Sequence, residues 1–158
     1  MIIGHLPSDY ILGRAFGFGT QVLMGAVVLG AVFPDFDLLF FYLVDNRAFH
    51  HHKYWVHAPG FWVLTSLIVA PALAWLYRPA LPLFGAFVAG NLLHTLLDSI
   101  AGGIMWRWPF STDLVSLVTV QPTHSHFVLS FMAHWTFWLE IALWLVAIGL
   151  FWKARRHG

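Results

Sequence analysis

The sequence predicts an all-α integral membrane protein, a single membrane-embedded domain over residues 1–158 with about four to five helical segments in the bilayer. Hydrophobic residues make up 59% of the chain and charged residues only 9%, whereas a soluble domain carries about 25% charged residues. So few polar side chains could not cover a globule in water. Apolar runs of helical length, separated by Gly, Pro and charged residues, provide the second observation.

The apolar runs predict the segments in order. Residues 2–18 and 22–33 are short and flank the glycines at 17 and 19, which favours a helical hairpin. Residues 38–44 predict a helix along the membrane interface, and 45–55 form the most polar part of the chain. Clear spans are predicted at 61–77, at 83–100 and, as the longest apolar run, at 127–152. Residues 102–123 predict a connection, weakly amphipathic at 114–120.

The basic residues predict the orientation. Five membrane segments place one group of basic side chains on one face and a smaller group on the other. The larger group is Arg14, Arg78, Lys153, Arg155 and Arg156, and the smaller is Arg47, Lys53 and Arg107. The positive-inside rule makes the first face, with the C-terminus, cytoplasmic. We therefore expect a multi-pass protein of the bacterial or archaeal cytoplasmic (inner) membrane, without a removable signal peptide because no charged n-region precedes the first apolar run.

Net charge and cysteine content exclude several functions. The formal net charge of +1 gives no indication of nucleic-acid binding. The absence of cysteine excludes disulfides and thiolate-bound zinc, so any metal must be held by nitrogen and oxygen atoms.

Ionisable side chains gather inside the apolar segment at 83–100. His94 and Asp98 are four residues apart and share one helix face, where an imidazole and a carboxylate can bind one ion. Asn91 on the same face is a candidate to orient a ligand. The alternative is a buried hydrogen-bonded pair that joins two helices. Ionisable groups inside a membrane generally indicate function.

A second acidic group follows Pro34, which ends the preceding apolar run. In an extended chain Asp35 and Asp37 would point to opposite sides, so that one could ligate while the other orients a histidine or serves a second metal. The alternative is a solvated helix cap at the interface.

Histidines in the polar segment and near the N-terminus complete the pattern. His52 and His57 are close enough for both to turn inward from a short loop, although His50–His52 could also be incidental loop residues. His5 and Asp9 repeat the i, i+4 spacing, but Asp9 is an equally good capping residue. Glu140, the only glutamate, lies in an apolar helix and must be paired or protonated. Whether it joins the site, with His124, His126 and His134, stays open.

The threading that orients the chain also places seven acidic and imidazole groups near the non-cytoplasmic face. They are His5, Asp35, Asp37, His52, His57, His94 and Asp98. This convergence predicts one composite metal site toward the outer face.

Five short motifs occur in order from His5 to Ser111, over about two thirds of the chain. They are Gly4-His5, Pro34-Asp35-Phe36-Asp37, His52-Lys53-Tyr54-Trp55-Val56-His57, Gly90-Asn91-Leu92-Leu93-His94 with Asp98, and Trp108-Pro109-Phe110-Ser111. In this order they resemble the membrane-bound metal-dependent hydrolases, also described as LexA-binding, inner-membrane-associated hydrolases. A fainter similarity is to bacterial zinc-dependent phospholipase C. Three positions depart from the family pattern: Lys53 stands for an arginine, Tyr54 for a glycine and Ala58 for a serine.

The pattern and the resemblance together imply a metal-dependent hydrolase of an amphiphilic phosphoester or ester, a lipid-like substrate met in the membrane. The expected metal ligands are His5, Asp35, His52, His57, His94 and Asp98. Asp37 is expected to be a general base or a bridging ligand, and Lys53 to bind a substrate anion. Zn²⁺ suits such ligands best, as one ion or two, with Mn²⁺ as the alternative. An ion with an open position would activate water for hydrolysis. The competing interpretation is a non-enzymatic metal-binding membrane protein that acts as a structural or regulatory partner.

Overall fold

The computed structural model describes residues 3–157, which form seven α-helices joined by 3₁₀ turns and loops. The α-helices are α1 (His5–Ala15), α2 (Gln21–Val32), α3 (Asp37–Leu43), α4 (Pro59–Leu76), α5 (Leu81–Ala101), α6 (Phe127–Met132) and α7 (Trp135–His157). The 3₁₀ turns are η1 (Pro34–Phe36), η2 (His51–Lys53), η3 (Trp55–His57) and η4 (Arg78–Ala80). Between residues 3 and 157 there is no strand, only an isolated bridge between Ile104 and Val115. The all-α prediction is confirmed.

Three helices are long and apolar enough to cross a bilayer: Pro59–Leu76, Arg78–Ala101 and Trp135–Arg156. A fourth candidate is a broken span in which Gln21–Val32 and Pro34–Leu43 meet at 47°. Pro34 lies at this break, as expected for a residue that cannot continue the amide ladder of α2. Three to four spans fit the predicted membrane bundle, and α1 is a shorter helix packed on them.

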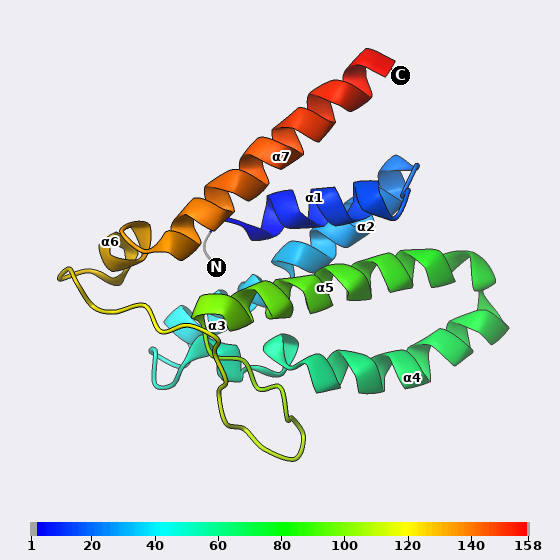
Figure 1. The fold of residues 1–158 in the computed structure, drawn as a ribbon. Coiled ribbons are helices and arrows are strands. Elements are labelled where there is room, and N and C mark those ends of the chain that lie inside the picture. The colour runs from blue at the N-terminus through cyan, green and yellow to red at the C-terminus, as the bar shows by residue number, and fades with distance from the viewer. Residues whose placement is uncertain (1–2, 158) are drawn as a thin grey trace.

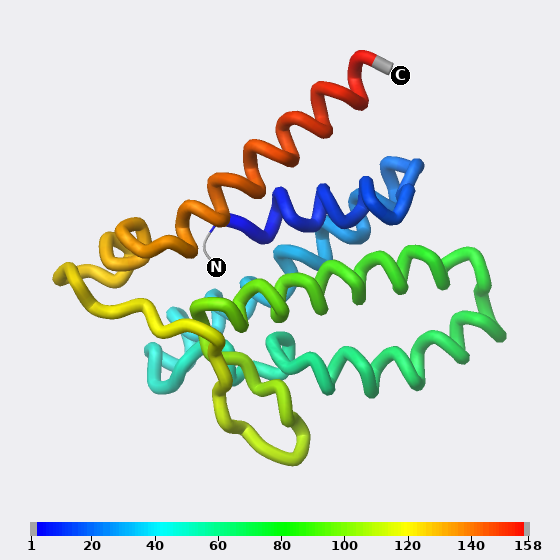
Figure 2. The backbone as a smooth tube through the Cα atoms, viewed as in Figure 1, coloured from blue at the N-terminus to red at the C-terminus, as the bar shows by residue number. Residues whose placement is uncertain are grey.

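Two helical hairpins and a long terminal helix make up the arrangement in Figure 1. Helices α1 and α2 form the first hairpin, whose connection includes Gly17 at a positive φ of 66°. Helices α4 and α5 form the second, and α5 packs against α2. Helix α7 packs along α1 and extends beyond it, as the tube in Figure 2 also shows.

The two hairpins meet at a close crossing of α2 and α5. A Cβ atom added to Gly30 would collide with the carbonyl oxygen of Phe87, and one added to Gly90 would collide with that of Val27. Only glycine permits these backbones to approach so closely, a common device of helix pairs in membranes. The crossing sets the C-terminal part of α2 beside the second half of α5, so that Asp35, in the turn η1 after α2, lies near His94.

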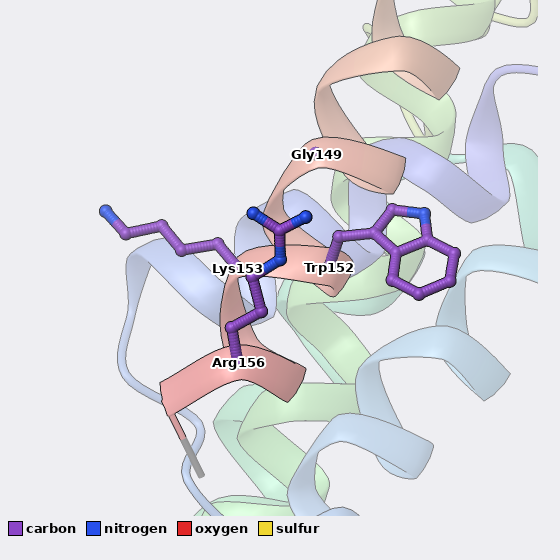
Figure 3. Close-up of a pocket in the computed structure, with 4 residues that line it drawn as sticks. All are labelled: Gly149, Trp152, Lys153 and Arg156. Carbon is purple, nitrogen blue, oxygen red and sulfur yellow. The ribbon is translucent and has the colours of Figure 1, made fainter.

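The predicted basic and ionisable groups occupy opposite ends of this arrangement. The C-terminal end of α1, the α4–α5 junction and the C-terminal end of α7 lie toward one side of Figure 1, and α3 with the following loop lies toward the other. Figure 3 shows Lys153 and Arg156 projecting from the last turns of α7. The first set of elements carries the larger basic group.

One local prediction differs from the structure, and two further segments are defined by it. The run at 127–152 is not one helix, because the chain breaks between α6 and α7, where the ring of His134 accepts a hydrogen bond from the Thr136 amide. Residues 114–120 lie in the predicted connection, where Val115 pairs with Ile104 and the Leu117 amide donates to the Ser99 carbonyl at the end of α5. Residues 34–37 are not extended but turn through η1 into α3.

Candidate metal centre

Helix α5 supplies the two central groups of the site. Both side chains are buried, and the Nε2 atom of His94 lies 3.0 Å from Oδ2 of Asp98. The other ring nitrogen of His94 lies 2.6 Å from the carbonyl oxygen of Ala31 in α2. Because that carbonyl can only accept, Nδ1 carries the proton, and Nε2 is the nitrogen that faces Asp98. A backbone partner that fixes the tautomer in this way is typical of a histidine that binds a metal.

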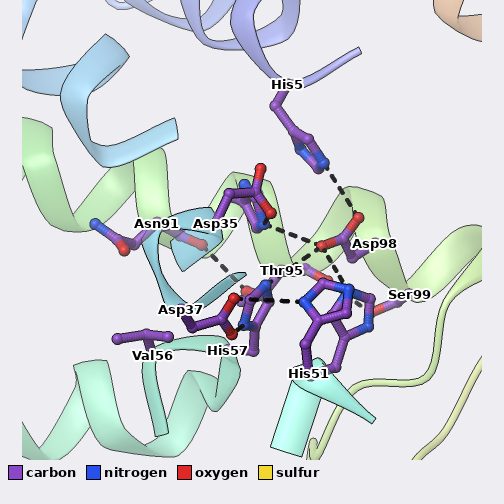
Figure 4. A network of polar contacts seen from close by, with 12 residues as sticks. His5, Asp35, Asp37, His51, Val56, His57, Asn91, Thr95, Asp98 and Ser99 are labelled. Carbon is purple, nitrogen blue, oxygen red and sulfur yellow. Dashed lines mark hydrogen bonds and ion pairs between the residues drawn. The ribbon is translucent and has the colours of Figure 1, made fainter. Parts of the chain in front are cut away.

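Asp98 is the hub on which imidazoles from three other segments converge (Figure 4). Its Oδ1 atom lies 3.1 Å from Nε2 of His5, and its Oδ2 atom lies 3.4 Å from Nε2 of His52 and 3.8 Å from Nε2 of His57. The ring of His5 also stacks on that of His94 with centroids 3.8 Å apart. The end of α5 thus gathers the start of α1 and the loop before α4 around one carboxylate.

The loop that contributes His52 is folded by its own polar groups. The His50 ring accepts a hydrogen bond from the His52 amide and starts the turn η2. The side chain of His52 is buried, and its Nδ1 lies 2.9 Å from the carbonyl oxygen of Gly103, so its Nε2 lone pair also faces Asp98. Burial lowers the pKa of His52, which keeps the ring neutral at pH 7 and able to bind a metal.

Asp37 lies behind the histidines of this loop. Its Oδ2 atom is 2.9 Å from Nδ1 of His57 and its Oδ1 atom is 3.5 Å from Nδ1 of His51. Asp37 and His57 are both buried. A carboxylate in this position could orient His57 from behind and would leave the Nε2 atom of the ring, which lies toward Asp98, free to bind a metal.

Asp35 is the most accessible acidic group of the cluster. Its side chain is 41% exposed, against 2% for Asp98, and its Oδ1 atom lies 3.8 Å from Nε2 of His94. The turn η1 therefore directs Asp35 and Asp37 to different parts of the cluster although the chain there is not extended. Asp35 marks the side at which water can reach the site.

The buried atoms of this cluster fit a cation. Nε2 of His94, both ring nitrogens of His57 and both oxygens of Asp37 are buried and make no hydrogen bond of normal geometry with any described residue. By distance, Asp37 pairs with His57 through the 2.9 Å contact. Buried polar atoms without partners are costly, and a metal ion among them would satisfy the lone pairs that face one another.

Three overlapping groups have ligand atoms within 4.8 Å of one another. They are His5, His94 and Asp98; His51, His52 and His57; and Asp35, His57 and His94. All six predicted ligands belong to these groups, and the overlap leaves room for one ion or two. His51 is an additional candidate that the sequence pattern did not single out, since spacing does not distinguish it from its neighbours His50 and His52.

Other predicted residues lie apart from the ligand groups. Lys53 is exposed on the loop that carries His52. The Asn91 amide donates to the Phe87 carbonyl of its own helix, and no contact joins it to a ligand in the described part of the chain, so its predicted orienting role finds no support. Four residues whose part in the site was left open belong to none of the three ligand groups: His124, His126, His134 and Glu140.

Comparison with known proteins gives one match that covers nearly the whole chain. The family model described as YdjM inner membrane protein matches residues 2–157. No curated protein and no solved structure matches the chain.

Proposed function

The chain belongs to the YdjM inner membrane protein family, and we propose that it is a membrane-bound metal-dependent hydrolase of an amphiphilic phosphoester or ester. The observation that carries this proposal is the convergence of buried imidazole nitrogens on the carboxylate of Asp98 at the end of a membrane helix. Ionisable groups at such a depth are retained for function.

The residues that would hold the metal are His5, Asp35, His52, His57, His94 and Asp98, with His51 as a further ligand. Their nitrogen and oxygen atoms suit Zn²⁺, and Mn²⁺ is the alternative. When bound, such an ion supplies a nucleophile from water at neutral pH and polarises the scissile ester. The Asp35 side chain is partly exposed, and there water and a substrate head group would reach the site.

For Asp37 we propose that the carboxylate holds His57 in place and acts on the reaction through it. The side chain is buried, and its oxygens face His57 and His51. A general base must reach the proton that it removes, and Asp35 is far more open to water. The role of Asp37 as a base or bridging ligand, expected from sequence, stays a competing prediction.

An apolar pocket beside the cluster supports an amphiphilic substrate. It has a volume of about 340 Å³ and is lined by Phe33, Phe36, Asp37, Phe40, Tyr54, Trp55 and Val56. Except for Asp37 and the Tyr54 hydroxyl the lining is hydrophobic, which suits a hydrocarbon chain better than a sugar or a peptide. Lys53 precedes Tyr54 and is exposed, so it can attract a phosphate outside the buried ligands.

The test is a substrate screen with metal-replete protein in detergent and in liposomes. Phospholipids, lipid phosphates and carboxyl esters of lipids are compared with water-soluble esters of the same head groups. We expect metal-dependent turnover of one amphiphilic class, lost in Asp98→Ala and retained in Asp113→Asn, whose carboxylate lies on the surface with a 72% exposed side chain. Equal turnover of the soluble analogues would contradict the amphiphilic substrate.

One observation favours the non-enzymatic alternative. Of the ligand candidates only Asp35 and His51 are noticeably exposed, so a metal bound by all of them would have no open position. No turnover of any class by metal-replete protein, with a closed coordination shell in an experimental structure, would establish a structural or regulatory role instead.

The orientation that we propose places the C-terminus in the cytoplasm and the metal centre toward the outer face of the inner membrane. It is supported by the excess of basic residues at the end opposite the cluster.

A further inference from the structure

Glu140 holds the backbone next to a metal-ligand candidate. This only glutamate of the chain is fully buried in α7, and its Oε2 atom accepts a hydrogen bond of 2.6 Å from the Ile3 amide. One turn later, the Trp144 indole donates a hydrogen bond of 2.9 Å to the Ile3 carbonyl. Two side chains of α7 thus bind both backbone polar groups of one residue, like a short clamp.

The clamp lies two residues before His5. The intervening Gly4 is fixed from the other side, because its carbonyl accepts hydrogen bonds from the amide and the hydroxyl of Ser8 in the first turn of α1. His5 then begins α1 and reaches Asp98 at 3.1 Å. The segment before His5 is therefore tied to α7, and the segment after it is tied within α1.

His5 needs such support because of its position. It is the first residue of its helix, where the amides have no partners within the helix and the ends of helices fray. Gly4, at the N-cap, has no side chain that could cap these amides. The other ligand candidates lie within α5 or in segments held between two helices, so His5 depends most on an outside anchor.

We propose that Glu140 and Trp144 are positioning residues that hold the Ile3 backbone on α7 and so deliver His5 to the metal centre. The inference rests on the proposed metal site and assigns a task to the buried acid that the site itself leaves unused. It also couples the otherwise peripheral α7 to metal binding, because a displaced α7 would release His5.

Metal affinity of the full-length protein in detergent tests this inference, measured by competition between Zn²⁺ and a chromophoric chelator. Glu140→Ala should weaken Zn²⁺ binding by about 10- to 100-fold, the usual cost of losing a residue that orients a ligand. Glu140→Gln keeps an oxygen that can accept from the Ile3 amide and should retain affinity within about threefold of wild type. Trp138→Phe, an exposed change in α7, should have no effect.

A double-mutant comparison separates positioning from general damage to the fold. If Glu140 acts through His5, His5→Ala and Glu140→Ala should each lower the affinity and shift the absorption of Co²⁺-substituted protein in the same way. The double variant should then lose little more than His5→Ala alone. Should Glu140→Ala fail to fold, Trp144→Phe removes only the indole donor and should weaken Zn²⁺ binding by a few-fold, about the value of one hydrogen bond.

Every result of these measurements either supports or overturns the positioning role of Glu140. Wild-type affinity and an unchanged Co²⁺ spectrum in Glu140→Ala, or in Trp144→Phe if the former does not fold, would overturn the positioning role while the metal site stands. Additive losses in the double variant would do the same. Absence of metal binding by the wild-type protein would refute the proposed metal centre itself, and the positioning role with it.

Discussion

Replacement of Asp37 by Asn distinguishes a residue that holds a ligand from a residue that takes a proton. The change keeps the size of the side chain but removes its charge, and it turns one carboxylate oxygen into an amide nitrogen. Because the two oxygens face the Nδ1 atoms of His57 and His51 at 2.9 and 3.5 Å, the variant must present a donor to one of these rings.

The magnitude follows from the role of the carboxylate behind His57. Loss of such a partner weakens metal binding by about 10- to 100-fold, or about 1.4 to 2.8 kcal/mol. The chemical step is untouched in this account, so turnover at saturating metal should return to within a few-fold of wild type. A general base would behave in the opposite way. Turnover would fall by about 10²- to 10⁴-fold at any metal concentration, and metal affinity would remain.

The assay measures Zn²⁺ affinity by chelator competition and then turnover against free Zn²⁺, both in the same detergent. Asp113→Asn provides the matched control on the exposed connection. An unchanged affinity together with a loss of turnover that excess metal does not restore would refute the holding role and establish Asp37 as the base.

Three further predictions concern the fold, pH and orientation. Gly90→Ala should destabilise the protein by about 1–3 kcal/mol in thermal unfolding, because its Cβ would meet the Val27 carbonyl, whereas Gly85→Ala in the same helix meets open space and should be neutral. Burial lowers the pKa of His52 below its ordinary 6.5, so the unfolded chain binds a proton at this ring more tightly than the folded chain does. Metal-free protein should therefore lose stability as the pH falls below 6.5. An unchanged unfolding temperature from pH 7.5 to 5.5 would contradict this. Ala48→Cys, in an exposed loop of a cysteine-free chain, should react with a membrane-impermeant thiol reagent in intact cells with a permeabilised outer membrane, and reaction only after lysis would reverse the orientation.

Most of the membrane segments could be predicted from hydropathy, because a helix that crosses lipid must be apolar over a fixed length. The predicted spans at 61–77 and 83–100 differ by one or two residues at each end from Pro59–Leu76 and Leu81–Ala101. The break between α6 and α7 was missed because it depends on a hydrogen bond from the Thr136 amide to the His134 ring. The apolar residues on both sides of it gave no sign of a helix end. The end of α5 fixes the path of residues 114–120 through backbone contacts, and these have no local sequence signal.

The sequence indicated which residues gather at the candidate site better than it indicated which of them contact one another. Spacing on a helix indicates that His94 and Asp98 share a face, and threading brings His5 and the loop histidines to the same depth. Whether a side chain turns toward the cluster depends on its partners in space. His51 faces Asp37, and Asn91 bonds back to its own helix, yet nothing in the spacing distinguishes these outcomes. The task of Glu140 depends on a contact across 137 residues of chain.

The metal content of purified protein tests the central claim most directly. After purification without metal-binding tags and exchange into metal-free detergent buffer, elemental analysis of the wild-type protein should find about one or two transition-metal ions per chain. His94→Ala and Asp98→Ala remove the two groups at the centre of the cluster and should lose most of that metal, because too few ligands then remain for a complete shell. A metal-free wild-type protein that takes up no Zn²⁺ or Mn²⁺ when these are supplied, or full occupancy in both variants, would contradict the account.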